Sequence, residues 1–235
     1  MAENQFQKLD ELHEEDKGQE CYDILKPLYD GSDANKQNIE ILWRLARACY
    51  AISKYLESKN PKKKEIIAEG QQYAVQAYGI DPDNFVVLKW AAVLTGQLTD
   101  YLGTKEKIEQ GYHFKNYLDK ALAIKSEYSL YHMRGRFAFS VASLSWLERK
   151  LASTLFATPP TATFDEALAD FLEVEKMRPS QWIENLWYIG RCYIEKKNYD
   201  KAVEYLKQAV SIEPDDDTEK EALEASQALL KKYSK

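Results

Sequence analysis

Three arginines of this 235-residue chain each stand one helical turn after an aromatic ring and directly after a small residue. A guanidinium pairs bidentately with a carboxylate or a phosphate, and an aromatic side chain adds apolar contact area at little entropic cost. The pattern therefore indicates a basic and aromatic surface that suits an acidic segment, with Lys89 as a further cation. The three pairs are Trp43 with Arg47, His132 with Arg136, and Trp187 with Arg191.

A second group of cations is contiguous in the sequence. Four lysines fall within six residues around the step Asn60-Pro61, namely Lys59, Lys62, Lys63 and Lys64. Proline is tolerated at the first position of a helix, so this basic run is expected at a turn between two helices. It either contacts an acidic protein surface or anionic lipid, or is simply solvated.

Helices must position these residues. Apolar residues recur at three- and four-residue spacing in most segments, as in 41–56, and prolines stand where such segments end. With only 9 glycines and 7 prolines, the chain is poor in the residues that form the frequent turns of an all-β sandwich or barrel, so such a fold is not expected.

Residues 183–216 match the 34-residue tetratricopeptide (TPR) pattern, a helix–turn–helix repeat. Gly190 and Ala202 are expected to be small because the two helices cross closely there, and Pro214 ends the second helix. The remaining matching positions are Leu186, Ile189, Tyr193, Tyr199, Leu206 and Ala209.

Weaker and longer copies of the repeat precede this one, with Ala46, Ala92 and Gly135 at the position of Gly190. The spacing in the third copy predicts a long first helix over roughly 129–157, followed by a loop at 157–161. Leu144, Trp146 and Arg149 lie at helical spacing on that helix and are expected in its core. Shorter helices are expected at about 4–16 and 19–30, and a last one at 216–233.

The predicted fold is therefore an all-α, TPR-like α-solenoid of about four helical hairpins with elongated helices, capped at both ends. The predicted divisions are acidic N-terminal capping helices at 1–33, helical repeats at 34–216, and a C-terminal capping helix at 217–235. In such repeats the first helix of each hairpin lines a concave groove. The residues predicted to bind an acidic partner there are Trp43, Arg47, Lys89, His132, Arg136, Trp187 and Arg191. The alternative is that the arginines pair with Glu40, Glu184 and Glu195 and only stiffen the scaffold.

Charge is unevenly distributed along the chain, whose net charge is -6. Residues 1–33 hold ten acidic residues and three lysines, and residues 213–224 hold seven acidic residues and one lysine. The segment 34–212 holds 25 Lys and Arg against 21 Asp and Glu. An acidic protein can thus present a basic surface, because exposed charges interact only over about 8–10 Å.

Sequence motifs of the common enzyme classes are missing. The sequence has no Gly-rich phosphate loop, no HExxH and no CxxC, so we expect a non-enzyme without cofactor or metal. The three cysteines, Cys21, Cys49 and Cys192, are expected to be buried and reduced. An acidic domain without a known motif argues against nucleic acid, and neither a signal peptide nor a transmembrane segment is expected.

The central block resembles the regulator of microtubule dynamics family over roughly residues 35–230. The resemblance is specific in Leu-Ser-Trp-Leu-Glu-Arg at 144–149 and in Ala-Thr-Phe at 162–164. The sequence departs from the family pattern at Leu88 and at Lys125-Ser126, both of which belong to the second predicted hairpin. The resemblance implies a TPR-like, non-enzymatic protein that binds microtubules at the mitotic spindle and acts in chromosome segregation.

The implied partners are tubulin, in the form of microtubules, and other spindle or kinetochore proteins. The implied location is the cytoplasm, on the cytoskeleton, spindle and spindle pole. One alternative function is a lipid-binding or membrane-contact adaptor, in which a TPR-like cavity takes a phospholipid. A third is a generic peptide-binding TPR scaffold, but the Asn partners of a two-carboxylate clamp are missing beside the groove arginines.

Overall fold

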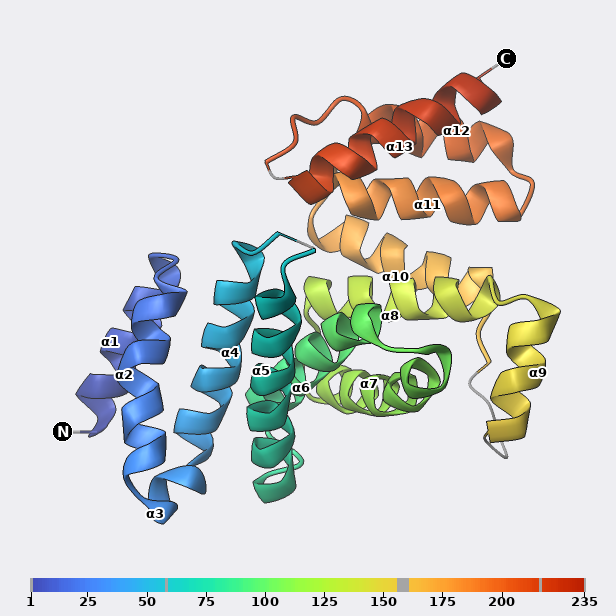
Figure 1. Cartoon of the computed structure of the whole chain (residues 1–235). Helices are drawn as coiled ribbons and strands as arrows, with labels where there is room; N and C mark the ends of the chain where they lie inside the picture. Colours follow the sequence, from blue (N-terminus) through green and yellow to red (C-terminus); the bar gives the residue numbers. More distant parts are fainter. Residues whose placement is uncertain (1, 58, 156–160, 216, 235) are drawn as a thin grey trace. The chain divides into compact units, whose positions relative to one another are not determined.

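The computed structural model of the chain describes residues 2–57, 59–155, 161–215 and 217–234. All regular structure within those ranges is helical. The chain forms two compact units, Met1–Lys125 and Ser126–Lys235 (Figure 1). This boundary falls between the second and third predicted hairpins.

The first unit consists of two helical hairpins preceded by shorter helices. Helices α4 and α5 form one hairpin and α6 and α7 the other, while α2 packs against α4 and α5 against α6. Helices α1 and α2 correspond to the two helices expected near 4–16 and 19–30. The bounds are α1 Ala2–Glu14, α2 Gly18–Gly31, α3 Asp33–Lys36, α4 Ile39–Lys54, α5 Pro61–Ile80, α6 Phe85–Leu98, the 3-10 helix η1 Thr99–Tyr101, and α7 Thr104–Ile124.

Asparagine side chains start the main helices of the first unit. The Asn38 side chain accepts a hydrogen bond from the Glu40 amide at 2.9 Å, and Asn84 does the same for Val86 at 3.0 Å. Asn60 caps α5 in this way, with Pro61 as the first helical residue. Each cap satisfies a backbone N–H that has no partner within the helix, which fixes where the helix begins.

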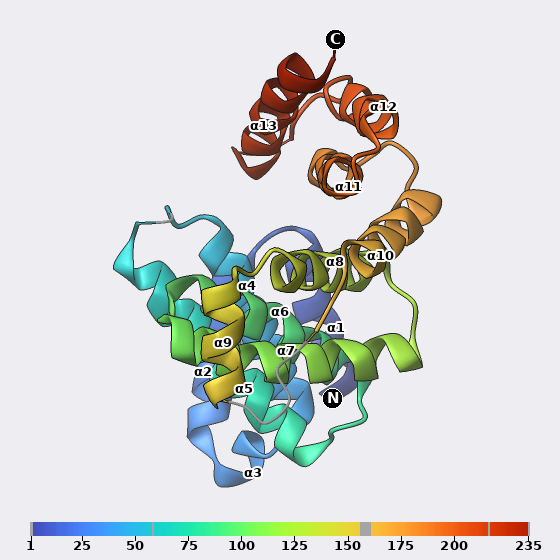
Figure 2. The same ribbon diagram turned by 90° about the vertical axis from the view of Figure 1, so that its right-hand side faces the viewer.

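The second unit contains the third and fourth hairpins and the C-terminal helix. Helix α8 packs on α10, α11 packs on α12, and α13 contacts both α11 and α12 (Figure 2). The predicted C-terminal helix is thus present as α13, although Asp216 lies outside the described residues. The bounds are α8 Tyr128–Ala142, α9 Trp146–Leu155, α10 Phe164–Met177, α11 Ile183–Glu195, α12 Tyr199–Ala209 and α13 Asp217–Tyr233.

The close helix crossings predicted from small residues are confirmed. A Cβ atom added at Gly190 would lie 2.7 Å from Leu206 Cγ of the partner helix. At Gly135 it would lie 2.8 Å from a ring carbon of Phe171. Both glycines therefore set the distance between the helices of their hairpins, since side-chain atoms do not approach this closely.

The long third-hairpin helix predicted over 129–157 is wrong. Helix α8 ends at Ala142 and a separate helix, α9, begins at Trp146. The Ser145 hydroxyl accepts a hydrogen bond from the Glu148 amide, and the Glu148 carboxylate accepts one from the Ser145 amide at 2.7 Å. This reciprocal cap starts a new helix where the apolar pattern alone suggested continuity. Residues 156–160, and with them most of the predicted loop at 157–161, lie outside the described residues.

The expected core position of Trp146 is also wrong, because 73% of its surface is exposed. Leu144 is half-buried, and Arg149 is exposed. The Arg149 guanidinium donates to the carbonyl oxygens of Ala142 and Leu144 at 2.7 and 3.0 Å. It thus satisfies carbonyl groups at the C-terminal end of α8, which is a structural role on the surface.

All three cysteines are free and buried, as expected. The Cys21 thiol lies beneath α1 and donates to the Leu9 carbonyl oxygen at 3.4 Å. Burial raises the pKa of Cys21 and Cys49, and raises that of Cys192 to about 12. A thiol with a raised pKa holds little of the reactive thiolate at neutral pH.

Candidate functional site

The predicted binding residues are distributed over the two units. Trp43 and Arg47 on α4 and Lys89 on α6 belong to the first. His132 and Arg136 on α8 belong to the second, as do Trp187 and Arg191 on α11. Each unit is therefore a separate candidate site.

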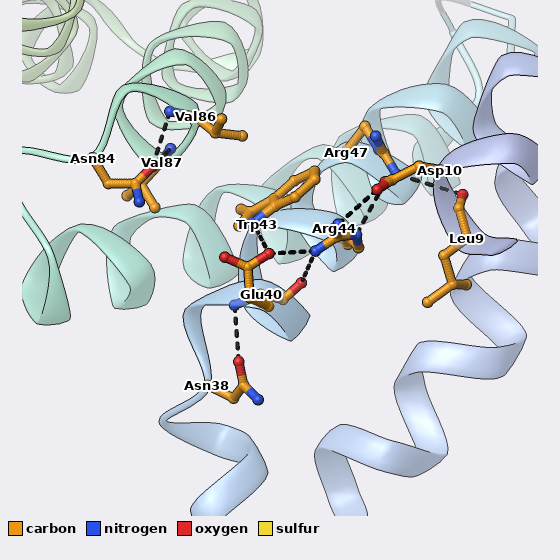
Figure 3. A network of polar contacts seen from close by, with 10 residues as sticks. All are labelled: Leu9, Asp10, Asn38, Glu40, Trp43, Arg44, Arg47, Asn84, Val86 and Val87. Atoms are coloured by element: carbon orange, nitrogen blue, oxygen red, sulfur yellow. Dashed lines mark hydrogen bonds and ion pairs between the residues drawn. The ribbon is translucent and has the colours of Figure 1, made fainter. Parts of the chain in front are cut away.

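In the first unit, Arg47 acts together with Arg44, which lies three residues earlier on α4, and both point toward α1 (Figure 3). The two carboxylate oxygens of Asp10 accept hydrogen bonds from Arg44 Nε at 3.0 Å and Arg44 Nη2 at 2.6 Å. Arg47 Nη2 donates to the same carboxylate at 2.6 Å. Only 8% of the Arg44 side chain and 12% of the Arg47 side chain are exposed. We call Arg44 and Arg47 the α4 arginine pair.

Aromatic rings complete the surroundings of the α4 arginine pair. The Arg44 guanidinium lies 4.0 Å from the centre of the Trp43 ring and 4.6 Å from that of Phe6, so it has aromatic contacts from α4 and α1. The Arg47 guanidinium lies 4.8 Å from the Trp43 ring. The Trp43 indole and Arg44 both donate to Glu40, at 3.1 and 2.6 Å. The aromatic–guanidinium pairing expected from spacing is thus present, but α1 lies over it.

Burial and charge shift the pKa values in this cluster. Burial alone would raise the pKa of Asp10, but hydrogen bonds from Arg44 and Arg47 outweigh it and lower the pKa below its ordinary value. Burial lowers the pKa of Arg47, which the contact with Asp10 opposes. The carboxylate of Asp10 is therefore held in its charged form against the arginines.

The His13 ring of α1 is expected to titrate with a pKa near 4, below the ordinary value of 6.5. Burial against the ring of Trp90 lowers its pKa most, and the charge of Arg47 lowers it further, although Asp10 and Asp16 oppose the shift. Because the folded pKa lies below the unfolded one, the stability supplied by neutral His13 is complete above about pH 6.5. It is lost as the pH falls toward 4. A proton NMR titration, assigned with His13→Asn, checks this, and a midpoint near 6.5 would contradict it.

In the second unit, Glu184 on α11 joins Arg136 and His132 of α8. Glu184 Oε1 lies 3.2 Å from Arg136 Nη1, and its other oxygen lies 3.3 Å from His132 Nε2. Burial would raise the pKa of Glu184, but His132 and Arg136 lower it overall. About half of the Arg136 side chain, 49%, remains exposed. The predicted alternative of pairing with Glu184 is therefore present at Arg136.

His132 is buried and does not reach the surface. Its Nδ1 lies 3.1 Å from Asn185 Oδ1, and its ring stacks on Trp182 with the ring centres 3.9 Å apart. The Asn185 amide in turn donates to the Phe171 carbonyl oxygen at 3.0 Å. His132 thus links α8 to α11, with its Nε2 3.3 Å from the Glu184 carboxylate that also pairs with Arg136.

Arg191 has a different environment from the other arginines. Its guanidinium lies 4.2 Å from the centre of the Phe139 ring, 4.5 Å from Trp187 and 5.3 Å from Tyr188. Arg136 lies 5.8 Å from the same Tyr188 ring. Among the residues that the structure describes, Arg191 forms no ion pair, with Glu195 or any other carboxylate. We call Arg136 and Arg191, which both lie near the Tyr188 ring, the Tyr188 guanidinium patch.

The basic run lies at the start of α5, as predicted. Lys59, Lys62 and Lys64 are exposed, while Lys63 is half-buried and donates to the Leu56 carbonyl oxygen at 2.9 Å. The first turn of α5 holds no acidic residue. Cations are unfavourable at this end of a helix, by about 0.3–1 kcal/mol for each exposed charge. Helix stability therefore does not account for the basic run.

Comparison with known proteins defines the family. The sequence profile described as "Regulator of microtubule dynamics protein 1-3" matches residues 5–234. The chain belongs to this family. It is 35% identical over 209 residues to regulator of microtubule dynamics protein 1 of Caenorhabditis elegans, covering 88% of this chain and 91% of that protein.

Bovine members of the regulator of microtubule dynamics family are also similar. Protein 1 of Bos taurus is 29% identical over 233 residues, covering 99% of this chain and 72% of that protein. Protein 2 of Bos taurus is 35% identical over 207 residues, covering 86% of this chain and 50% of that protein. The chain thus spans only about half the length of this last relative.

Solved structures of low sequence identity support the fold. A crystal structure of the MamA protein aligns with a TM-score of 0.57 at 15% identity, covering 90% of this chain and 92% of that one. A thermophilic TPR protein of Thermus thermophilus aligns with a TM-score of 0.59 at 12% identity, covering 97% of this chain and 100% of that one. The predicted all-α, TPR-like solenoid is confirmed for this family member.

Sequence reasoning missed two central residues, Asp10 and Arg44. The repeat register places only Arg47 on the groove face and gives no reason to select Arg44. The acidic N-terminal segment has the composition of a polar cap, and nothing local signals that one of its carboxylates reaches α4. An arginine one turn from another on an otherwise apolar helix face was the available signal, because a buried arginine requires a partner.

None of the helices that the structure describes is long and apolar enough to cross a bilayer. No group of three or more His, Cys, Asp or Glu side chains among the described residues is arranged to hold a metal ion.

Proposed function

We propose that this protein is a non-catalytic microtubule-binding protein that acts at the mitotic spindle in chromosome segregation. The observation that carries this proposal is the similarity of most of the chain to proteins named regulators of microtubule dynamics. The proposed partner is tubulin in the microtubule lattice, with other spindle or kinetochore proteins as further partners. The proposed location is the cytoplasm, on the cytoskeleton, spindle and spindle pole.

We assign the contact with tubulin to cationic groups that meet acidic tubulin segments. The Tyr188 guanidinium patch fits this role best, because Arg191 is held by three rings and lacks an ion-pair partner among the described residues. The rings fix the guanidinium and leave it able to donate to an incoming carboxylate. The half-exposed Arg136 adds a second donor beside the same ring.

The remaining predicted residues take different parts in this proposal. His132 positions Glu184 and Trp187 supports Arg191, so both act through a neighbour. Lys89 is half-buried on α6, and the exposed lysines of the basic run offer a further contact surface in the first unit. An exposed ion pair contributes only about 0–1 kcal/mol, so useful affinity needs several such contacts and falls with added salt.

Cosedimentation with stabilised microtubules tests the proposal. The double variant Arg136→Glu/Arg191→Glu should weaken binding about tenfold or more, because two attractive contacts become repulsive and about 1.4 kcal/mol corresponds to a factor of ten. Removing the acidic tubulin tails with subtilisin should weaken wild-type binding in the same way.

The matched control is Lys176→Glu/Lys207→Glu, which makes the same charge change on exposed residues of α10 and α12. It should bind as the wild type does. Unchanged binding of the arginine variant would exclude the Tyr188 guanidinium patch. If Lys62→Glu/Lys64→Glu then lost binding, the contact would lie at the basic run instead. No binding by the wild type would refute the function.

The open cleft beside α1 does not support the alternative function of phospholipid binding. That cleft is lined by Asp10, Glu11, Glu14 and Glu40 together with Phe6, Gln7 and Arg44. Four carboxylates repel an anionic phospholipid headgroup. Native mass spectrometry of the purified chain is the direct test, because a bound phospholipid would appear as added mass.

A further inference from the structure

The α4 arginine pair already holds an acidic ligand, which belongs to the same chain. Asp10 engages Arg44 through Nε and Nη2 at 3.0 and 2.6 Å, and Arg47 through Nη2 at 2.6 Å (Figure 3). This two-pronged geometry is the one in which a guanidinium binds any carboxylate. A carboxylate from another molecule would therefore make the same contacts.

The segment that supplies Asp10 is itself acidic. Residues 10–16 read Asp-Glu-Leu-His-Glu-Glu-Asp, so five of seven side chains are carboxylates. Glu11, Glu14 and Glu15 are all exposed, and within the described part of the chain the ion pairs of the two arginines go to Asp10 and Glu40. In its chemistry, α1 is thus an acidic segment that is covalently joined to the α4 arginine pair it binds.

A small number of side chains hold α1 in place. Leu9 is fully buried, and its carbonyl oxygen accepts from Cys21. Phe6 covers Arg44, and His13 lies edge-on to Trp90 with the ring centres 6.5 Å apart. The carboxylate of Asp10 is thus one of few anchors, and its loss should allow α1 to leave more readily.

We propose that α1 is an intramolecular acidic ligand that closes the α4 arginine pair and is displaced by an acidic segment of a partner protein. This inference rests on the proposed function, which assigns acidic segments as the ligand. Displacement would exchange one carboxylate for another, so the buried guanidiniums would remain paired throughout. The tethered helix would act as a competitor at high effective concentration, which lowers the apparent affinity for the partner.

Two charge-matched variants of the full chain test the proposal. Asp10→Asn removes the carboxylate that touches the arginines, and Glu14→Gln removes another carboxylate from the same helix. The probe is a fluorescein-labelled decaglutamate peptide, followed by fluorescence anisotropy at low salt. Asp10→Asn should bind the probe about fivefold or more tightly than the wild type, because more of the chain is open. Glu14→Gln should bind like the wild type.

Two further variants determine whether the gain comes from the α4 arginine pair. Adding Arg47→Gln to Asp10→Asn should abolish the gain. Leu9→Ser removes the apolar anchor of α1 without changing any charge, and it should also tighten probe binding. Equal affinities of Asp10→Asn and Glu14→Gln would overturn the proposal, as would a gain that survives Arg47→Gln.

Amide hydrogen exchange tests the proposal on the wild-type chain, so this test does not depend on whether any variant folds. Saturating decaglutamate should accelerate exchange of the α1 amides at residues 6–14, since α1 leaves its site. Unchanged or slower exchange with the probe bound would overturn the proposal while leaving microtubule binding through the Tyr188 guanidinium patch intact. If no variant binds the probe and the wild type does not cosediment with microtubules, both the proposed function and this inference are refuted.

Discussion

Replacing Phe171 with alanine is expected to lower the free energy of unfolding by about 3–5 kcal/mol. The ring is fully buried at the crossing of α8 and α10, where it fills the space left by Gly135. It stacks on Tyr188 with the ring centres 5.0 Å apart and meets the edge of His132 at 5.5 Å. Alanine would leave a cavity beside three helices that cannot close without moving them.

Urea-induced unfolding, followed by circular dichroism, measures this loss. Phe171→Leu should cost less, because leucine keeps much of the buried apolar volume. A loss below about 1 kcal/mol for Phe171→Ala would show that the second unit repacks around the missing ring. The same variant should weaken microtubule binding, since Phe171 stacks on Tyr188, whose ring lies near both guanidiniums of the patch.

Replacing Asn185 with leucine is expected to cost about 2–4 kcal/mol, although leucine is similar in size and apolar. Two buried groups would lose their partner, the Phe171 carbonyl oxygen at 3.0 Å and His132 Nδ1 at 3.1 Å. An unpaired buried polar group costs roughly 1–3 kcal/mol, which outweighs the apolar gain of leucine.

A double-mutant cycle identifies the origin of this cost. His132→Phe removes one of the unpaired groups and keeps a ring to stack on Trp182, so it should restore part of the stability lost in Asn185→Leu. Gln181→Leu, on an exposed residue of the same unit, should change stability by no more than about 0.5 kcal/mol. Additive costs of Asn185→Leu and His132→Phe would contradict the shared hydrogen bond.

The repeats could be predicted from the sequence because close helix crossings require small residues at regularly spaced positions. Gly190 and Gly135 must be small where a partner side chain approaches to 2.7 and 2.8 Å from the position of a Cβ atom, and that requirement recurs at a set spacing. The helix break before Trp146 also had a local signal, the Ser145-x-x-Glu148 capping box. Apolar periodicity taken without this cap predicts one continuous helix and places Trp146 in its core, whereas the side chain is exposed.

The contacts of the candidate sites could be predicted only in part. The spacing of Trp187 and Arg191 follows from one turn of a single helix, and their contact is observed. Asp10 and Arg44 are 34 residues apart on different helices, so the angle at which α1 packs decides whether they meet. That angle depends on the burial of Leu9 and Phe6, which the pattern of one short helix does not determine.

The three buried thiols allow local opening of the chain to be measured through the rate at which each one is chemically labelled. Cys21 and Cys49 lie in the first unit and Cys192 in the second. The rate at which a maleimide labels each cysteine, measured on the separate peptides, therefore reports how fast each unit opens. Cys21 is the most informative of the three, because its sulfur lies against the carbonyl of Leu9. A reagent reaches it when α1 lifts, whereas Cys49 requires α4 and α5 to separate. The ratio of the two labelling rates distinguishes release of the N-terminal helix from melting of the scaffold beneath it, without any engineered probe.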